Sequence, residues 1–417
     1  MQKKLMAVAV AGALSAPAVA LAQSSTVQIY GTMYMEYSIV DQGSSAAAGN
    51  PALADVDHLQ SPGSEIGFKG EEKLGGGLSA WFQCSSTAEI RGISQNGWCS
   101  RNSALGLKGG FGNVFVGNWD TPFKRTSGPG MVGSNDTGSF GSSFLLTGGS
   151  TTVPVGPGAI AAATPLGATR GVFRRRQNNS INYDSPNFGG FQVMAQFTAA
   201  QASTALLDGA NNSKPRVISI GGQYSAGPLF LGAAFERHNE YHLVSPVPPV
   251  AGSPRDGDDD GWHFAAAYTW GPVRVGGLYT RQKFETGTAA VPTDSRVRAF
   301  HLGVDWRIVG PHGLRGGYTK VGDIKGTPGA PFINGSGSIR PAVPVAGAPN
   351  DPGADLFQIR YVYTFSKRTE FNFGYVKLDN DGNVTTGGAA YTLGSLGAAV
   401  APGNNQDAWV MSLRHTF

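Results

Sequence analysis

The sequence is poor in the features that mark most enzymes and nucleic-acid-binding proteins. Lys, Arg, Asp and Glu make up only 14% of its 417 residues, and the formal net charge is +4. No basic arm or basic helix occurs, so nucleic acid is not expected as a partner. The seven His residues are scattered without metal-ligand spacing, and we find no CxxC pair, phosphate-binding Gly loop or Ser/His/Asp constellation. The sequence therefore predicts no cofactor, no metal site and no catalytic residue.

A long apolar run is also missing. After residue 22, no stretch of about 20 consecutive apolar residues occurs, so a transmembrane helix is not expected. Residues 1–22 begin with two lysines, continue with an apolar run too short to span a bilayer, and end in a small-x-small motif at 20–22. This order is typical of a secretory signal peptide, cleaved before Gln23. Loss of the two lysines lowers the formal net charge from +4 to +2 and leaves residues 23–417 as one large domain.

Cysteine is scarce, with only Cys84 and Cys99 present. An exported protein meets an oxidising compartment, so we expect a disulfide between them, with two free thiols as the alternative. The bond would close a loop of about 16 residues, worth roughly 3 kcal/mol in the chain-entropy description.

What the sequence has in abundance is alternation of apolar and polar side chains with a period of two, accompanied by 61 Gly. The final segment shows it clearly, because Trp409, Met411, Leu413 and Phe417 fall on one face of an extended chain. Sixteen such segments predict β-strands. They cover residues 27–40, 65–72, 78–88, 103–108, 113–119, 177–184, 191–198, 216–225, 229–238, 262–270, 273–284, 296–308, 314–324, 355–365, 369–378 and 406–417.

The connections between these strands are alternately short and long. Seven are short turns and eight are long loops, which predicts an all-β fold: a 16-stranded antiparallel up-and-down transmembrane β-barrel. A bilayer offers no water to an open sheet edge, so the last strand, which ends at Phe417, is expected to close the barrel against the first. Aromatic residues near the strand ends would form interfacial girdles. A soluble β-sandwich with those residues in its core is the alternative.

The longest connection covers residues 120–173. It is rich in Gly, Ser, Thr, Ala and Pro, nearly free of long charged side chains, and expected to be unstructured. A loop of this length in a compact domain is normally functional or disordered.

A second notable loop holds four aspartates between Asp256 and Asp260. It looks like the start of a calcium loop, but Ala267 stands where an EF-hand needs a bidentate acid. A solvated surface loop is therefore expected, and weak binding of a divalent ion stays open as the alternative.

Four stretches carry a family resemblance: LGGGLSA at 74–80, GNWDTPF at 117–123, NNSINYDSPNFGGF at 178–191 and RHTF at 414–417. In these the chain resembles the general porins of Gram-negative outer membranes, over its whole length after the signal peptide. The resemblance implies a homotrimer in the outer membrane, in contact with lipid and lipopolysaccharide. It also implies that residues 120–173 fold into the pore as a constriction loop, and that the terminal aromatic serves recognition by the barrel-assembly machinery.

Strand parity and the resemblance select the charged residues expected in the pore. Three consecutive arginines, 174–176, form the densest positive cluster, and we expect them to face the acid-poor loop and favour anions. A solvated strand end, or a site for lipopolysaccharide phosphates, is the alternative. Arg101 stands where the resembled family has a basic wall residue, but its parity is outward, so a bulge or the nearby loop must re-aim it. The expected pore-lining or constriction set is Glu36, Lys69, Arg101, Arg125, Asp136, Arg174, Arg176 and Arg360.

The sequence thus predicts an outer-membrane channel for the passive diffusion of small hydrophilic solutes and ions, with a preference for anions. A channel of the same fold that is specific for one solute is the closest alternative. An outer-membrane barrel enzyme or an adhesive, plugged barrel is the more distant one.

Overall fold

The structure is a computed structural model that describes most of the chain. The described residues are 26–43, 54–91, 97–147, 173–198, 216–239, 258–285, 294–323, 325–326, 332–333, 339–340, 353–383, 387–388, 391–393 and 403–417. The expected signal peptide, residues 1–22, lies outside them, as do residues 148–172 of the longest loop.

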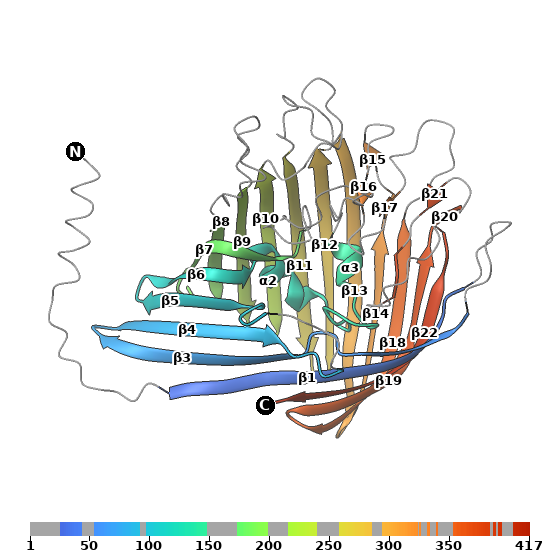
Figure 1. The fold of residues 1–417 in the computed structure, drawn as a ribbon, viewed down its shortest axis with the longest axis horizontal. Helices are drawn as coiled ribbons and strands as arrows, with labels where there is room; N and C mark the ends of the chain where they lie inside the picture. Colours follow the sequence, from blue (N-terminus) through green and yellow to red (C-terminus); the bar gives the residue numbers. More distant parts are fainter. Residues whose placement is uncertain are drawn as a thin grey trace.

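The fold is all-β, and its main sheet contains 18 strands. Two of these, β2 (Val56–Gln60) and β15 (Lys325–Gly326), are short strands that pair beside β1 and β13, so sixteen strands build the wall (Figure 1). The sixteen are β1 (Thr26–Asp41), β3 (Glu65–Gly75), β4 (Leu78–Thr87), β5 (Ser103–Gly109), β6 (Gly112–Asp120), β7 (Arg176–Asp184), β8 (Phe191–Thr198), β9 (Arg216–Ala226), β10 (Leu229–Asn239), β11 (Asp259–Trp270), β12 (Val273–Glu285), β13 (Asp294–Val309), β14 (His312–Val321), β18 (Ala354–Ser366), β19 (Thr369–Asn380) and β22 (Gln406–Thr416). The predicted number and order of strands are confirmed.

Two small hairpins stand apart from this sheet. They are formed by β16 (Phe332–Ile333) with β17 (Ile339–Arg340), and by β20 (Gly382–Asn383) with β21 (Gly387–Gly388). No helix in the described parts of the chain is long and apolar enough to cross a membrane.

The sheet closes on itself between its first and last strands. β1 pairs antiparallel with β22, from Thr32 opposite Thr416 to Asp41 opposite Asp407. Beyond this register, Gly31 N–H donates to Phe417 O at 3.1 Å, and Phe417 N–H donates to Gly31 O at 3.0 Å. The expected closure at Phe417 is confirmed, and the row of backbone donors and acceptors on β1 has a partner strand.

The two faces of the wall differ in the way the alternation predicts. On β22, Trp409 is 54% exposed and Leu413 51%, whereas Val410 and Ser412 between them are 1% and 3% exposed. Large apolar side chains recur on the same outer face of the other strands, and near the short turns they are often aromatic, as at Trp270. An outer apolar band of this kind suits hydrocarbon rather than water. We call the opposite face the inner face.

Short turns connect seven strand pairs at one end of the barrel. In three of them the turn begins with a glycine in the left-handed region: Gly227, Gly271 and Gly310, at φ +52°, +55° and +53° respectively. Two-residue hairpin turns require positive φ to match the twist of their strands, and glycine adopts it without steric cost.

The longest connection is partly helical, so the expectation of an unstructured stretch is wrong for its first part. It contains α2 (Pro122–Ser127), a 3-10 turn η1 (Gly128–Gly130) and α3 (Ser143–Leu146). α2 forms because Thr121 caps it, accepting a hydrogen bond from Lys124 N–H, and proline occupies its first position. We call residues 121–147 the inner segment.

The disulfide between Cys84 and Cys99 is present, with a Cα–Cα distance of 4.7 Å. It ties the end of β4 to the turn that precedes β5. The expected pairing is confirmed.

Candidate functional site

The inner segment packs on the inner face of the barrel along one flank from β9 to β13. Phe123 N–H donates to Ser219 Oγ at 3.1 Å, and Gln282 Nε2 donates to Leu146 O at 2.8 Å. Two buried histidines take part: His301 Nε2 donates to Val132 O at 2.9 Å, and His263 Nε2 lies 3.0 Å from Thr126 Oγ1. The apolar side chains of this flank form a continuous core with the wall. Its fully buried members include Phe123, Phe140, Leu145, Leu146 and Phe173.

The other flank is tied to β1 and β18 by charged groups. Glu36 is fully buried and accepts hydrogen bonds from Ser139 N–H and Gln60 Nε2, both at 2.8 Å, and from Tyr34 Oη. Arg360 is also buried; its Nη2 donates to Asn135 Oδ1 at 2.9 Å, and its guanidinium lies 4.7 Å from the ring centroid of Phe140. Glu36 and Arg360 therefore hold the inner segment rather than line open space.

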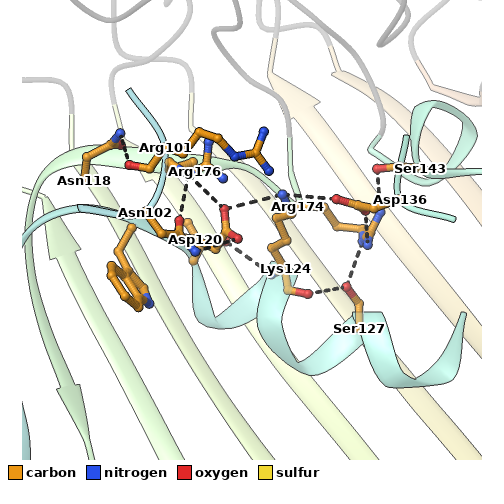
Figure 2. A network of polar contacts seen from close by, with 12 residues as sticks. Arg101, Asn102, Asn118, Asp120, Lys124, Ser127, Asp136, Ser143, Arg174 and Arg176 are labelled. Atoms are coloured by element: carbon orange, nitrogen blue, oxygen red, sulfur yellow. Dashed lines mark hydrogen bonds and ion pairs between the residues drawn. The ribbon is translucent and has the colours of Figure 1, made fainter. Parts of the chain in front are cut away.

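Arg174 joins the two ends of the inner segment (Figure 2). Its guanidinium donates to Ser127 Oγ and Ser143 Oγ, each at 2.7 Å, and to Asp136 Oδ1 at 3.0 Å. The Arg174 side chain is 1% exposed, whereas that of Asp136 is 43% exposed and also lies 3.2 Å from Lys124 Nζ. The surrounding protein raises the pKa of Asp136 by removing water, but the charges of Arg174 and Lys124 outweigh this, so its pKa lies below the ordinary value. Asp136 is therefore a permanent anion beside a buried cation.

Arg176 and Arg101 form a second, more open group at the start of the inner segment (Figure 2). Arg176 Nε lies 2.7 Å from Asn102 Oδ1 and 3.3 Å from Asp120 Oδ1, and Lys124 Nζ lies 3.4 Å from the same Asp120 oxygen. The turn ahead of β5 directs Arg101 to the inner face, where its Nε donates to Glu65 Oε2 at 2.8 Å.

The remaining two residues of the expected set differ in their partners. Arg125 makes a bidentate pair with Asp184, at 2.7 and 2.8 Å. Lys69 is exposed, with its Nζ 5.0 Å from the ring centroid of Tyr30.

The arginine cluster at residues 174–176 meets acids of the loop that it was expected to face, and its preference for anions stays a prediction. Arg174 is paired with Asp136, Arg176 is paired with Asp120, and Arg175 is buried. The loop carries few acids, but two of them, Asp120 and Asp136, lie next to the arginines and pair with them. Three members of the expected pore-lining set, Glu36, Arg174 and Arg360, are buried and serve as attachment points.

Several residues of the site were missed in the sequence. Asp184 continues the inward parity of Ser180 and Asn182, so strand alternation could have identified it. His263 and His301 likewise fall on inward positions of their strands. Asp120 has no such signal, because it stands where β6 ends and the inner segment begins.

The loop at Asp256–Asp260 is only partly described, since residues 256 and 257 lie outside the described part. Asp258 pairs with Arg237 and accepts from Asn239 Nδ2 at 3.1 Å. Within the described ranges, no group of three or more His, Cys, Asp or Glu side chains could hold a metal ion.

Known proteins with related sequences are found among outer-membrane proteins. Residues 7–383 match the family described as Gram-negative porin. Major outer membrane protein P.IB of Neisseria meningitidis serogroup B is 30% identical over 234 residues, which are 55% of this chain and 59% of the relative. The protein of the same name from Neisseria gonorrhoeae is 30% identical over 191 residues, 44% of this chain and 46% of the relative. The chain thus spans 59% or less of these two relatives.

Solved structures show the same fold at lower identity. The anion-selective porin from Comamonas acidovorans superposes with a TM-score of 0.65 at 22% identity, covering 94% of this chain and 100% of that chain. OmpT, an outer membrane protein of Vibrio cholerae in its trimer form, gives a TM-score of 0.58 at 15% identity, covering 95% and 100%. At these identities the likeness concerns the barrel architecture alone.

Proposed function

Since the chain belongs to the Gram-negative porin family, we propose that it forms a water-filled channel across the outer membrane for the passive diffusion of small hydrophilic solutes and ions. The observation that carries the proposal is the closed sixteen-stranded wall, which is apolar outside and lined inside by charged and amide side chains. Such a wall satisfies every requirement of a membrane-spanning sheet while leaving a polar path. The proposed activity is diffusion, with no catalytic step.

The inner segment is proposed to narrow this path and set its field. Attachment to the inner face supports this role, because the segment is hydrogen-bonded to β1 and β18 and also to β9 and β13. The groups left accessible beside it are Arg101, Lys124, Arg125, Asp136 and Arg176.

A modest preference for anions follows from the charge count around the inner segment. The groups joined by ion pairs are five cations and four anions, a balance of 5 − 4 = +1. The cations are Arg101, Lys124, Arg125, Arg174 and Arg176, and the anions are Glu65, Asp120, Asp136 and Asp184. Because almost every charge is paired, the field is weaker than a row of free arginines would create.

The test is reconstitution of the purified protein in a planar bilayer with a KCl gradient. Ohmic single-channel steps and a reversal potential displaced slightly toward that of chloride are expected. Absence of conductance from folded protein contradicts the channel, whereas conductance with cation preference contradicts only the proposed field.

We further propose that residues 1–22 direct export, that the outer-membrane assembly machinery inserts the barrel, and that three copies associate in contact with lipid and lipopolysaccharide. The trimer form of the Vibrio cholerae neighbour supports the association. Electrophoresis without heating tests it, since a folded trimer would migrate as a species that heating converts to the monomer. The alternative of lipopolysaccharide phosphates on Arg174 is disfavoured by the burial of that side chain.

A further inference from the structure

A recess opens in the inner face and is lined by none of the ion-paired residues counted around the inner segment. It has a volume of about 460 Å³ and is lined by side chains of β1, β3, β4, β5 and β6. The strand register explains why they meet. Gln28, Lys69 and Gln83 lie opposite one another on three adjacent strands, and Trp81 is opposite Glu71. Lys108 lies opposite Asn113 across the next hairpin.

The floor of the recess is aromatic and fixed in place. Trp81 contacts Phe115 and Trp119, with ring centroids 5.4 and 5.8 Å away, and Phe115 and Trp119 are 5.2 Å apart. The indole N–H of Trp81 donates to Asn113 Oδ1 at 2.7 Å. The indole lies directly on Gly106, where a Cβ would stand only 2.5 Å from Nε1, so the ring needs glycine beneath it. Trp119 is the part of this floor that stays partly exposed.

The rim of the recess carries two ammonium groups, of which one has a carboxylate partner and the other does not. Lys108 Nζ is 3.0 Å from Glu71 Oε2 and 5.2 Å from the Trp81 ring centroid. Lys69 is exposed, and no carboxylate of the described residues lies within ion-pair distance of it. This differs from the inner segment, where Lys124, Arg125, Arg174 and Arg176 each have a carboxylate partner.

We propose that this recess binds small aromatic carboxylates as they pass through the channel, an inference that rests on the proposed channel function. The carboxylate pairs with Lys69, beside the amide of Gln28, and the ring packs against Trp119 at the edge of the aromatic floor. The side chains of the recess fit this ligand class better than three related classes of small solute. A neutral sugar would leave Lys69 unused, an organic cation would meet two ammonium groups against one carboxylate, and an aliphatic acid would leave the aromatic floor uncovered.

The experiment measures how benzoate blocks the ionic current of single channels. Acetate supplies the carboxylate without the ring, and benzyl alcohol supplies the ring without the charge. Benzoate is expected to reduce the current saturably, whereas the other two probes at the same concentration leave it unchanged. Equal effects of benzoate and acetate would overturn the proposal.

Variants locate the site. Lys69→Gln is expected to raise the half-blocking benzoate concentration about tenfold, the ratio for loss of one charge-assisted hydrogen bond at a half-open site. Trp119→Leu is expected to raise it by a similar factor. Lys73→Gln is the matched control, since Lys73 is exposed on the same strand and lies outside the recess, so it should leave the block unchanged. A thermal midpoint in detergent equal to that of the wild type shows that each variant is folded.

A second readout separates this inference from the function on which it rests. Isothermal titration of the folded protein in detergent with benzoate measures binding without any need for conduction. Binding that Lys69→Gln weakens, in a protein that does not conduct, would sustain the recess and reject the channel. Conduction without benzoate block or benzoate binding would reject the recess alone.

Discussion

Charge is handled differently in two regions of the inner face. Around the inner segment, Arg125, Arg174 and Arg176 each have an aspartate partner, and Arg174 is buried. In the recess between β1 and β6, Lys69 is exposed, lies 5.0 Å from the ring centroid of Tyr30, and lines the same hollow as Trp81 and Trp119. Paired charges therefore hold a piece of chain in place around the inner segment, whereas the exposed Lys69 stays available for the solute proposed above.

The largest effect is expected from Glu36→Ala. The change leaves Ser139 N–H and Tyr34 Oη without their acceptor in a buried place and removes one acceptor of Gln60 Nε2, at a cost of about 3 kcal/mol to the attachment of the inner segment. Single-channel recordings should show a larger and noisier conductance, because the freed segment no longer holds one position. Glu36→Gln keeps an acceptor of the same shape and should give a smaller change; identical behaviour of both variants and the wild type would mean that Glu36 does not hold the segment.

A smaller loss is expected from Arg174→Ala. It removes three hydrogen bonds and leaves Asp136 without its buried partner, but Asp136 is open to water and keeps Lys124, so we expect a loss of about 2 kcal/mol. The thermal midpoint of the barrel in detergent measures it. Arg174→Lys retains the charge without the planar set of donors, so its thermal midpoint should lie between those of the wild type and Arg174→Ala. A midpoint equal to that of the wild type would contradict the role of Arg174 as a tie.

Asp136→Asn should alter selectivity more than stability. It raises the local charge balance from +1 to +2, which is expected to increase the anion-to-cation permeability ratio about twofold in the bilayer experiment. A shift toward cations would contradict the assignment of Asp136 to the conducting path.

The pH dependence of the ion pair between Asp136 and Arg174 follows from the direction of the pKa shift of Asp136. The pKa of Asp136 is lowered in the folded protein, so its pairing contributes fully above the ordinary aspartate value, about 3.9, and is lost only as the pH falls through the lower folded-state pKa. The contribution of Asp136 to the reversal potential should therefore be the same at pH 7 and pH 5. Comparing wild type with Asp136→Asn at both pH values isolates it, and a difference between the variants that shrinks at pH 5 would mean that the aspartate titrates there.

The smallest effect concerns the recess. Glu71→Gln breaks an exposed ion pair with Lys108, which is worth about 0.5 kcal/mol or less in stability. It also removes the one carboxylate on the recess rim, so benzoate should bind about threefold more tightly by titration. Weaker binding would show that Glu71 positions Lys108 for the ligand rather than opposing it.

The wall could be predicted from the sequence because its signal is local. Side chains of each strand alternate between the two faces with a period of two. The faces of residues such as Val410 and Leu413 can therefore be assigned without knowing which strand pairs with theirs. The inner segment could not be predicted in this way. Its ties join Glu36 to Ser139 and Asp136 to Arg174, groups far apart in the chain with no periodic relation.

Arg174 illustrates the limit most clearly. As a member of a basic cluster, it is expected to face the acid-poor loop and favour anions. Its burial, however, depends on Ser127, Ser143 and Asp136, which come from one folded segment. The aromatic floor of the recess could not be predicted from the alternation along any one strand. Its three rings and the glycine below them come from neighbouring strands, so only the register brings them together.

The seam between β1 and β22 also has a kinetic consequence. The hydrogen bonds between Gly31 and Phe417 connect residues 417 − 31 = 386 positions apart, so the contact order of this pairing is very high. The entropy of bringing such distant strands together must be overcome before the pairing stabilises anything, which slows this step relative to the local hairpins. Until then both strands expose unpaired edges, so an incompletely closed chain is the species most prone to aggregate.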